Sequence, residues 1–357
     1  DLSDLPTLQR LRERAFIAPQ HHTTYPYTNR ALFSFYSSLY PSSLTRSFNQ
    51  QLPRMELQAL PHRLGVRGYR TGIVSPVAIR FEEDERMYRA LGFDDFPDVK
   101  ADGKLADGES MLALDRGALK LLEGALEELI DRDERWFLAF HPQIGHAPWP
   151  DVSLDGGLET VAERGRALFQ LQDRWLGRLV DLLERKGRLE QTLIVFTADH
   201  GICTKLGDPE LVAGRLDAYS FHVPLLVWAP MVLDETHRVP WLTSHVDVAP
   251  TLGHLLGVAP TLPAQGSPLW DERLARRTTF FFGNHYLGAD GFHRGGEFVM
   301  RAHVADEVYE APGRMAFQEQ HLVPRDTPRH FEVQHVIRRM VGLQETWVRH
   351  FARRDEP

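Results

Sequence analysis

Apolar runs of strand length alternate with longer helical patterns along most of the chain. The clearest runs are WFLAFH at 136–141, TLIVFTAD at 192–199 and VPLLVWAP at 223–230. Because the first two contain few polar residues, we expect helices to cover both of their faces. Strands that alternate with helices in this way are typical of βαβ units, so the pattern predicts an α/β fold around a central, mostly parallel sheet.

Helical spacing fills the segments between these strands. Between 171 and 187 the apolar side chains recur on one face, and Gly187 follows as a C-terminal cap; the recurring residues are Leu171, Trp175, Leu179 and Leu183. A second helix is expected from about 113 to 130, and an earlier strand at 68–75. The pattern changes near 262, so we expect one domain over residues 1–261 and a C-terminal subdomain over 262–357 that completes the fold.

The C-terminal subdomain carries its own pattern. TTFFFGN at 278–284 predicts one more strand, and the Gly-rich segment GADGFHRGGEF predicts a hairpin or loop. The tail from Arg329 is patterned as an amphipathic helix. None of these segments contains a motif that indicates a particular chemistry.

Composition excludes several classes of function. The chain has 357 residues and a net charge of -8, which argues against a nucleic-acid partner because phosphate backbones are held by clustered Lys and Arg. The single cysteine, Cys203, excludes an intramolecular disulfide and a Cys-rich zinc site. No apolar run is long enough to predict a membrane span, and the first residues, DLSDLPTLQRLRER, are not patterned as a signal peptide.

Polar residues with chemical potential follow two of the predicted strands. Asp199 and His200 end TLIVFTADHG, and His141 and His146 follow WFLAF, so both groups are expected at the carboxyl edge of the sheet, where ligands bind in α/β folds. Asp and His in succession can turn toward one metal ion, while the alternative is that Asp199 merely caps the next helix. Imidazoles in a loop can grip an oxyanion, and the alternative there is a Pro-stiffened loop with incidental histidines.

Two further histidines are weaker candidates for binding substrate. His222 lies in FHVPLLVWAP and His245 in TSHVDVAPTLGHLLG. With 17 histidines in the chain, several must have no catalytic role. Asp247, in the second segment, precedes an apolar helical run and is suited to cap its N-terminus.

The order of these segments resembles the sulfatase-like branch of the alkaline phosphatase superfamily. The resemblance covers roughly residues 4–260 and rests on several individually weak motifs in the expected order; they are YPYTNRALFSFYSSLYP, HRLGVRGYRTGIVS, LGFDDFPD, WFLAFHPQIGHAPW, TLIVFTADHG, VPLLVWAP and SHVDVAPTLGHLLG. It implies a sulfatase-like catalytic domain over 1–261 and a three-layer α/β sandwich. Extracytoplasmic location, such as the periplasm, follows from the resemblance alone.

The resemblance also implies a nucleophile. In sulfatases this residue lies thirteen positions before the Pro of a Tyr-Pro that ends an apolar helix, and that count from Pro41 reaches Thr28. No Cys is present there for conversion to formylglycine, so the site is more similar to phosphoethanolamine transferases and lipoteichoic acid synthases. The bland alternative is that Thr28 caps the helix that follows it.

A metal site follows from the same resemblance, with Thr28, Asp199 and His200 as ligands. An Asp-His pair suits Zn²⁺ or Mn²⁺ better than Ca²⁺, which prefers oxygen ligands. His146 matches a residue that holds substrate phosphate. In the family this sequence resembles, a further acidic ligand on the first strand lies roughly forty residues before the nucleophile, whereas only 27 residues precede Thr28 and neither Asp1 nor Asp4 matches that ligand. Either this first strand is missing from the sequence or the protein lacks a complete site. We therefore expect an incomplete metal shell or a substitute ligand.

These residues predict a metal-dependent phosphotransferase or phosphoester hydrolase that forms a phospho-threonine at Thr28 and acts on phosphoesters, including lipid- or glycan-linked ones. One alternative is a sulfatase-like sulfoester hydrolase. Another is a non-catalytic sulfatase-fold module for binding or assembly. Neither the substrate nor the choice between water and an alcohol as acceptor can be read from the sequence.

Overall fold

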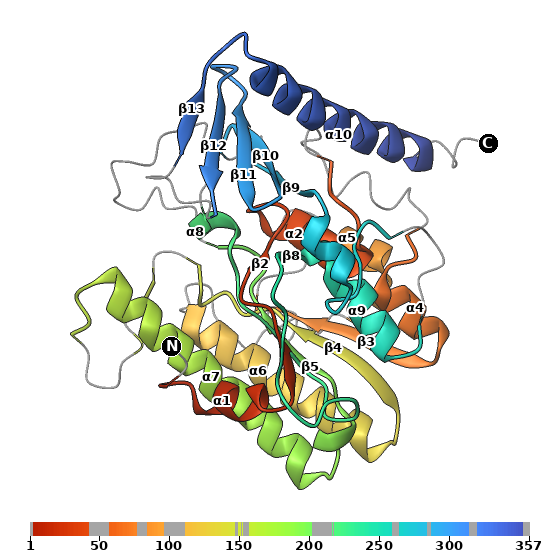
Figure 1. Cartoon of the computed structure of the whole chain (residues 1–357). Coiled ribbons are helices and arrows are strands. Elements are labelled where there is room, and N and C mark those ends of the chain that lie inside the picture. Colours follow the sequence, from red (N-terminus) through yellow and green to blue (C-terminus); the bar gives the residue numbers. More distant parts are fainter. Residues whose placement is uncertain are drawn as a thin grey trace. The chain divides into compact units, whose positions relative to one another are not determined.

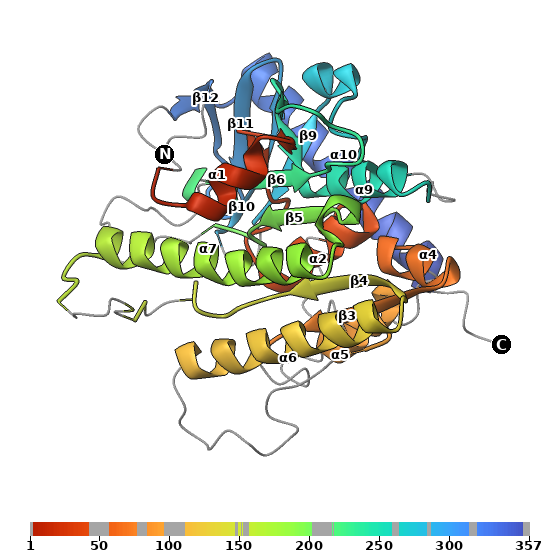
Figure 2. The same cartoon turned by 90° about the horizontal axis from the view of Figure 1, so that it is seen from below.

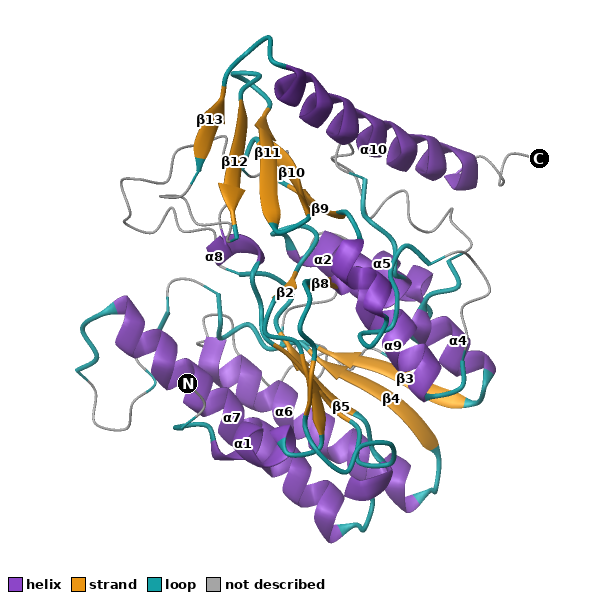
Figure 3. Cartoon of the chain, in the orientation of Figure 1, coloured by secondary structure: helices purple, strands orange, loops and turns teal. Residues whose placement is uncertain are grey.

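The structure is a computed structural model in which helices and strands alternate along the chain (Figures 1 and 3). The described residues are 3–42, 57–76, 84–95, 111–146, 149–150, 152, 157–201, 216, 218–258, 264–283, 287–313 and 320–352. They divide into two compact units. Unit 1 comprises Asp1–Ile17, Leu64–Val195 and Leu226–His237, and unit 2 comprises Ala18–Arg63, Phe196–Leu225 and Arg238–Pro357.

Unit 1 is built on two parallel strands and the helices that pack against them. Strand β3 (Tyr69–Val74) pairs in parallel with β4 (Arg135–Phe140), and α6 (Met111–Asp131) buries Ala118 and Leu122 against Val74. The long helix α7 (Val161–Arg185) lies beside α6 (Figure 2) and buries Leu171 and Trp175 in the adjoining core cluster. These elements confirm the strands expected at 68–75 and 136–141 and the helix expected from 113 to 130.

Short elements complete unit 1. Helix α7 begins at a capping box formed by Thr160 and Glu163, ten residues before the predicted helical pattern. The buried carboxylate of Asp173 accepts hydrogen bonds from the backbone N–H groups of Thr7 and Leu8, which holds α1 (Pro6–Arg12) on α7. Helix α5 spans Asp84–Leu91, and α4 (Leu60–Val66) crosses the boundary between the units.

The remaining predicted strands lie in a mixed sheet. Strands β5 (Ile194–Thr197) and β6 (Leu225–Trp228) confirm the strands expected at 192–199 and 223–230, within the sheet order β5-β6-β1-β7. However, β1 (Ala15–Ile17) pairs antiparallel to β6, and β7 (His237–Arg238) follows at the other end. The expectation of one mostly parallel sheet with these strands in its interior is therefore wrong for the described residues, whose sheets are mixed and fragmented.

Unit 2 carries a separate antiparallel sheet. Its order is β13-β12-β11-β10-β9, and the bounds are Thr279–Phe282 for β9, Ala289–Arg294 for β10, Glu297–Ala302 for β11, Val308–Pro312 for β12 and His321–Val323 for β13. Strands β10 and β11 join through Gly295 and Gly296, whose positive φ angles suit a tight hairpin turn. The predicted strand and hairpin are confirmed.

A long helix covers this sheet. Helix α10 (Pro328–Ala352) confirms the helix expected from Arg329 and lies along one face of the sheet (Figure 1). Its residues Val333 and Ile337 join a buried cluster with Phe292, Val299 and Val308 of the strands. No helix in the described part of the chain is long and apolar enough to cross a membrane.

The rest of unit 2 connects this sheet to short inner elements. These are β2 (His21–His22), α2 (Thr28–Ser37), α8 (Ala218–Phe221), β8 (Thr243–Ser244), the 3-10 helix η4 (His245–Asp247) and α9 (Val248–Leu255). Strand β2 pairs in parallel with β8, so that His21 lies opposite Thr243. A buried cluster of Tyr25, Tyr40, Val246, Phe282 and Met340 ties the tyrosine-rich segment to the C-terminal elements. A further 3-10 turn of unit 2 lies at Glu272–Arg276, and unit 1 has one at Leu189–Gln191.

Candidate functional site

Thr28 is the first residue of helix α2, not its cap. Tyr27 takes the N-cap position with extended backbone angles, and no side chain caps the helix there. The Thr28 hydroxyl instead donates a hydrogen bond of 2.8 Å to Oδ2 of Asp199. The alternative that Thr28 serves as an N-cap is therefore wrong, and its hydroxyl points at a carboxylate that follows strand β5.

Helix α2 is buried and anchored at both ends, which fixes the position of Thr28. Nearly all of the helix beyond its first residue is buried, including Phe33 and Phe35. At its C-terminal end Ser38 has a positive φ of 63°, and its hydroxyl donates to the carbonyl of Val246 at 2.6 Å. A hydrogen bond of 2.7 Å between the hydroxyls of Thr24 and Ser34 fastens the segment before the helix. Thr28 is thus half-buried at the end of a well-anchored element.

The segment Asp199–Gly201 forms the opposite side of the site. Oδ1 of Asp199 accepts the backbone N–H of His200 at 2.8 Å, which leaves Oδ2 for Thr28. Nδ1 of His200 lies 2.6 Å from the carbonyl oxygen of Gly201. A carbonyl can only accept, so Nδ1 carries a proton, and in the neutral ring Nε2 then carries the lone pair. That Nε2 lies 3.5 Å from Thr28 Oγ1 and 3.5 Å from Asp199 Oδ2.

Gly201 is required by close packing rather than by an unusual backbone angle. Its N–H donates to the carbonyl of Ser220 at 3.0 Å, so the segment lies directly on helix α8. A Cβ at this position would be 1.8 Å from the carbonyl oxygen of Tyr219. Only glycine lets the two backbones approach this closely. The contact therefore fixes the position of Asp199 and His200 relative to α8.

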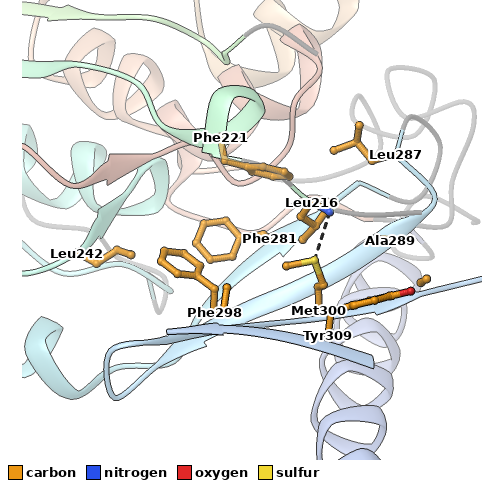
Figure 4. Close-up of a cluster of buried hydrophobic side chains, with 11 residues drawn as sticks. Leu216, Phe221, Leu242, Phe281, Leu287, Ala289, Phe298, Met300 and Tyr309 are labelled. Atoms are coloured by element: carbon orange, nitrogen blue, oxygen red, sulfur yellow. Dashed lines mark hydrogen bonds between the residues drawn. The ribbon is translucent and has the colours of Figure 1, made fainter. Parts of the chain in front are cut away.

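Strands of the sheet β13-β12-β11-β10-β9 pack against α8. Phe221 of α8 packs edge to face on Phe281 of β9, with ring centroids 5.4 Å apart. Figure 4 shows both rings in a buried cluster with Phe298 and Met300 of β11, where Met300 also receives the backbone N–H of Leu216. Residues beyond 262 therefore hold the Asp199–Gly201 segment in place, a role that their sequence does not indicate.

The donor atoms of this site are of the kinds that bind divalent cations. One carboxylate oxygen, one imidazole nitrogen and one hydroxyl oxygen converge, and the His200 tautomer leaves its lone pair on the side of Thr28. The hydrogen bond from the other ring nitrogen to a backbone carbonyl is typical of metal-binding histidines. Across the described ranges no group of three or more His, Cys, Asp or Glu side chains could hold a metal. Thr28 would thus be the third protein donor, and further donors must come from elsewhere.

The other predicted histidines occupy different surroundings. His245 is fully buried, and its Nε2 lies 2.7 Å from the carbonyl oxygen of Asp199. His222 is exposed, stacks on His22 with ring centroids 5.1 Å apart, and donates from Nε2 to the carbonyl of Pro19. His141 and His146 belong to unit 1, and their roles remain predictions.

In unit 1 a buried carboxylate holds the loop of His141 and His146. Asp115 of α6 accepts the backbone N–H groups of Gln143 at 2.9 Å and Ile144 at 2.6 Å. Burial raises the pKa of Asp115 to about 6, against the opposing effect of these two hydrogen bonds. His146 continues the loop by donating its N–H to the carbonyl of Gln143.

Asp247 lies at the N-cap position of α9, but its side chain makes no cap hydrogen bond to that helix. Its buried carboxylate pairs with the two terminal guanidinium nitrogens of Arg277 and accepts the backbone N–H groups of Ser244 and Ser267. The pairing with Asp247 raises the pKa of Arg277 against the effect of burial. Asp247 therefore does take part in capping, as the N3 residue of a capping box that accepts the N–H of Ser244 at the start of η4, and it also forms an interior ion pair.

Sequence reasoning missed His21 and His22. Both are buried on β2, a two-residue strand seven positions before Thr28. The adjacent pair HH was a visible signal, but so short a strand leaves no periodic pattern by which to place it.

Comparison with known proteins places these features in a family. The sulfatase family matches residues 1–258. A 106-residue stretch is 36% identical to the choline-sulfatase of Rhizobium meliloti (strain 1021); this match covers 28% of the chain and 20% of the choline-sulfatase.

Solved structures share the fold at low identity. The lipoteichoic acid synthase LtaP from Listeria monocytogenes is 18% identical, with a TM-score of 0.70 over 97% of this chain and 86% of LtaP. A protein in the alkaline phosphatase superfamily from Vibrio parahaemolyticus is 19% identical, with a TM-score of 0.74 over 98% of this chain and 83% of that one. The phosphonate monoester hydrolase SpPMH from Silicibacter pomeroyi is 14% identical, with a TM-score of 0.61 over 96% and 90% of the two chains. The chain has the α/β fold of the alkaline phosphatase superfamily and belongs to the sulfatase family.

Proposed function

We propose that this protein is a metal-dependent phosphotransferase or phosphoester hydrolase that attacks its substrate through Thr28. The observation that carries the proposal is the 2.8 Å hydrogen bond from Thr28 Oγ1 to Asp199 Oδ2, with His200 Nε2 at 3.5 Å. A hydroxyl that donates to a carboxylate is partly relieved of its proton, and its oxygen is then a better nucleophile.

The first half-reaction transfers the phosphoryl group to the protein. Oγ1 of Thr28 forms a bond to phosphorus as the bond from phosphorus to the leaving oxygen breaks, while the hydroxyl proton passes toward Asp199. Helix geometry leaves the N–H groups of the first turn of α2 without carbonyl partners in the helix, so they can receive phosphoryl oxygens. In the second half-reaction, the oxygen of water or of an acceptor alcohol bonds to phosphorus and gives its proton to solvent. The bond from phosphorus to Oγ1 breaks, and Oγ1 takes back the proton held by Asp199, which restores the hydroxyl.

A divalent cation suits the donors Thr28, Asp199 and His200, and when bound it supplies positive charge that stabilises the developing negative charge on oxygen. Zn²⁺ and Mn²⁺ match the mixed nitrogen and oxygen donors better than Ca²⁺. His146 is proposed to bind a substrate oxygen, with His141 and His222 as further candidates. His245, which was also expected to bind substrate, is fully buried with both ring nitrogens hydrogen-bonded and is not proposed as a substrate ligand. Phosphoesters linked to lipid or glycan are the proposed substrate class, in keeping with a fold shared with a lipoteichoic acid synthase.

A second candidate function is sulfoester hydrolysis. It is favoured by the sulfatase family match and by the local similarity to a choline-sulfatase. The threonine at position 28 speaks against it, because sulfatases of that kind convert a Cys or Ser to formylglycine.

The test uses the full-length protein, loaded with Mn²⁺ or Zn²⁺ and incubated with bis(p-nitrophenyl) phosphate or with p-nitrophenyl sulfate. Intact mass and peptide mapping should show a phosphoryl adduct on Thr28, with release of nitrophenol. Thr28→Val should show neither, while Thr28→Ser should retain part of the turnover. Turnover of the sulfate ester alone would support the second candidate. Metal loading without turnover of either ester would support a non-catalytic binding module.

A further inference from the structure

A chain of buried side chains runs from strand β8 to the Asp199 segment. Nδ1 of His21 lies 2.9 Å from the hydroxyl of Thr243, and Nε2 of His21 lies 2.9 Å from Nδ1 of His245. Nε2 of His245 lies 2.7 Å from the carbonyl oxygen of Asp199. His21, Thr243 and His245 are each 0% exposed. The parallel pairing of His21 with Thr243 in β2 and β8 brings these groups together.

The carbonyl oxygen of Asp199, at one end of this series of hydrogen bonds, determines which nitrogen of each imidazole carries the proton. The Asp199 carbonyl can only accept, so His245 must carry its proton on Nε2 and offer a lone pair at Nδ1. Nε2 of His21 must then donate to that lone pair, and the Thr243 hydroxyl donates to Nδ1 of His21. Both imidazoles are neutral Nε2–H tautomers, and the hydrogen bonds all point toward Asp199.

His245 also contacts the helix that carries Thr28. Its ring lies edge to face with Phe35 of α2, at a centroid distance of 5.4 Å and an interplanar angle of 85°. One imidazole therefore touches both halves of the candidate site, the helix on one side and the Asp199 backbone on the other. Burying three polar side chains costs free energy that an apolar core would not, and the complete set of hydrogen bonds offsets it.

We propose that His245, oriented by His21, is a positioning residue that fixes the Asp199–His200 segment relative to Thr28. This role rests on the proposed function of Thr28. His245 holds the Asp199 carbonyl through one nitrogen and contacts helix α2 through its ring. His21 and Thr243 prevent the imidazole from rotating or changing tautomer. Neither His245 nor His21 is required to touch the substrate.

The first test reads the tautomers directly in the full-length protein. Long-range ¹⁵N–¹H correlation spectra of the histidine rings should show Nε2–H tautomers for both His21 and His245. A His245→Leu variant should also shift the His200 ring and Gly201 amide signals, which the matched control His254→Leu, at an exposed site on α9, should leave in place. An Nδ1–H tautomer at His245, or unchanged His200 signals in His245→Leu, would overturn the proposal.

The second test uses turnover and separates positioning from folding. His245→Gln keeps an N–H donor near the Asp199 carbonyl and should retain most of the parent kcat. His245→Leu should lower kcat by about 10- to 100-fold with KM changed less than about 2-fold, as expected for a misplaced catalytic group. His21→Leu should lower kcat in the parent but have no further effect in the His245→Leu background, because His21 acts only through His245. Two outcomes would contradict the positioning role of His245. One is that the losses of kcat from His21→Leu and His245→Leu are additive, and the other is that folded His245→Gln and His245→Leu have equal kcat.

The two proposals fail in different ways. Failure of the proposed function would appear as turnover that Thr28→Val leaves intact, or as no turnover in the metal-loaded parent. In that case the tautomers of His21 and His245 and the His200 signals alone decide whether His245 is a positioning residue.

Discussion

The hydroxyl of Thr28 donates a 2.8 Å hydrogen bond to Asp199 Oδ2 across a separation of 171 residues. Thr28 is at the start of a buried helix, and Asp199 follows a strand, so each is placed by a different element. The two elements are joined by His245, which touches Phe35 of the helix and the carbonyl of Asp199. The geometry of the site therefore depends on packing within unit 2. Substitutions can change the hydroxyl of Thr28, the close packing at Gly201 and the proposed metal ligands separately.

Replacing Thr28 should separate catalysis from stability. Thr28→Val keeps the shape of the side chain and removes the hydroxyl, so we expect phosphoester turnover to fall by several orders of magnitude. Because Thr28 caps no helix, the free energy of unfolding should change by about 1 kcal/mol or less, the usual net value of one hydrogen bond. Urea unfolding and initial rates on the same samples give both numbers. Equal turnover in the parent and Thr28→Val would remove Thr28 as the nucleophile.

Gly201 should tolerate no Cβ. In Gly201→Ala the new carbon would lie 1.8 Å from the Tyr219 carbonyl, so the Asp199–Gly201 segment must move away from α8. We expect a loss of about 1 to 3 kcal/mol in the free energy of unfolding, together with a lower kcat.

A glycine in open space provides the control for this substitution. Gly124→Ala, on α6, has no atom within 4 Å of the new carbon and should stabilise the protein by about 0.5 to 1 kcal/mol. Thermal unfolding of the two variants should shift in opposite directions, and a Gly201→Ala protein at least as stable as the parent would show that the close approach at Gly201 is relieved at no cost.

The local pattern of the sequence predicts elements better than it predicts their partners. The apolar runs correctly place β4, β5 and β6 because strand burial leaves a local signal. The three-residue β1 leaves none, yet it pairs antiparallel with β6 and changes the sheet from parallel to mixed. Strand pairing joins segments far apart in the sequence, and a short strand can enter it without a recognisable pattern.

The candidate site shows the same division. Family resemblance brought Thr28, Asp199 and His200 together, and these three side chains converge in the structure. Residue type alone suggested that Thr28 and Asp247 cap helices. The Thr28 hydroxyl donates to Asp199 instead, whereas Asp247 accepts the N-cap N–H of Ser244 and pairs in addition with Arg277, a tertiary partner that residue type does not indicate. His21 could not be selected among 17 histidines, because its importance comes only from its contact with His245.

Metal binding should depend on the Asp-His pair. Asp199→Asn and His200→Gln each replace one proposed ligand with a weaker neutral donor, so both should lower Mn²⁺ or Zn²⁺ content after dialysis, measured by elemental analysis. Asp181→Asn, at an exposed position on α7, is the matched control and should keep the parent's metal content. Full metal content in Asp199→Asn contradicts its assignment as a ligand.

The free energy of unfolding should depend on pH because the carboxyl group of Asp115, in unit 1, is buried. Burial raises its pKa from the ordinary 3.8 to about 6, so the folded state binds this proton more tightly than the unfolded state. The stabilising contribution is fully present below pH 3.8 and is lost as the pH rises through about 6, a change of about 3 kcal/mol. Buried His22 in unit 2 acts in the opposite direction, because burial lowers its pKa to about 3 and acid destabilises its folded state.

Comparison with Asp115→Asn isolates the contribution of the carboxyl group from that of the histidines. Asparagine cannot ionise, and its side-chain oxygen can still accept one of the two N–H groups of Gln143 and Ile144. We expect the difference in unfolding free energy, parent minus variant, to decrease as the pH rises from 4.5 to 7.5, as measured by urea unfolding at intervals across that range. A difference that stays constant with pH would mean that Asp115 titrates alike in the folded and unfolded chains, and that the His141–His146 loop is held without burying a charge.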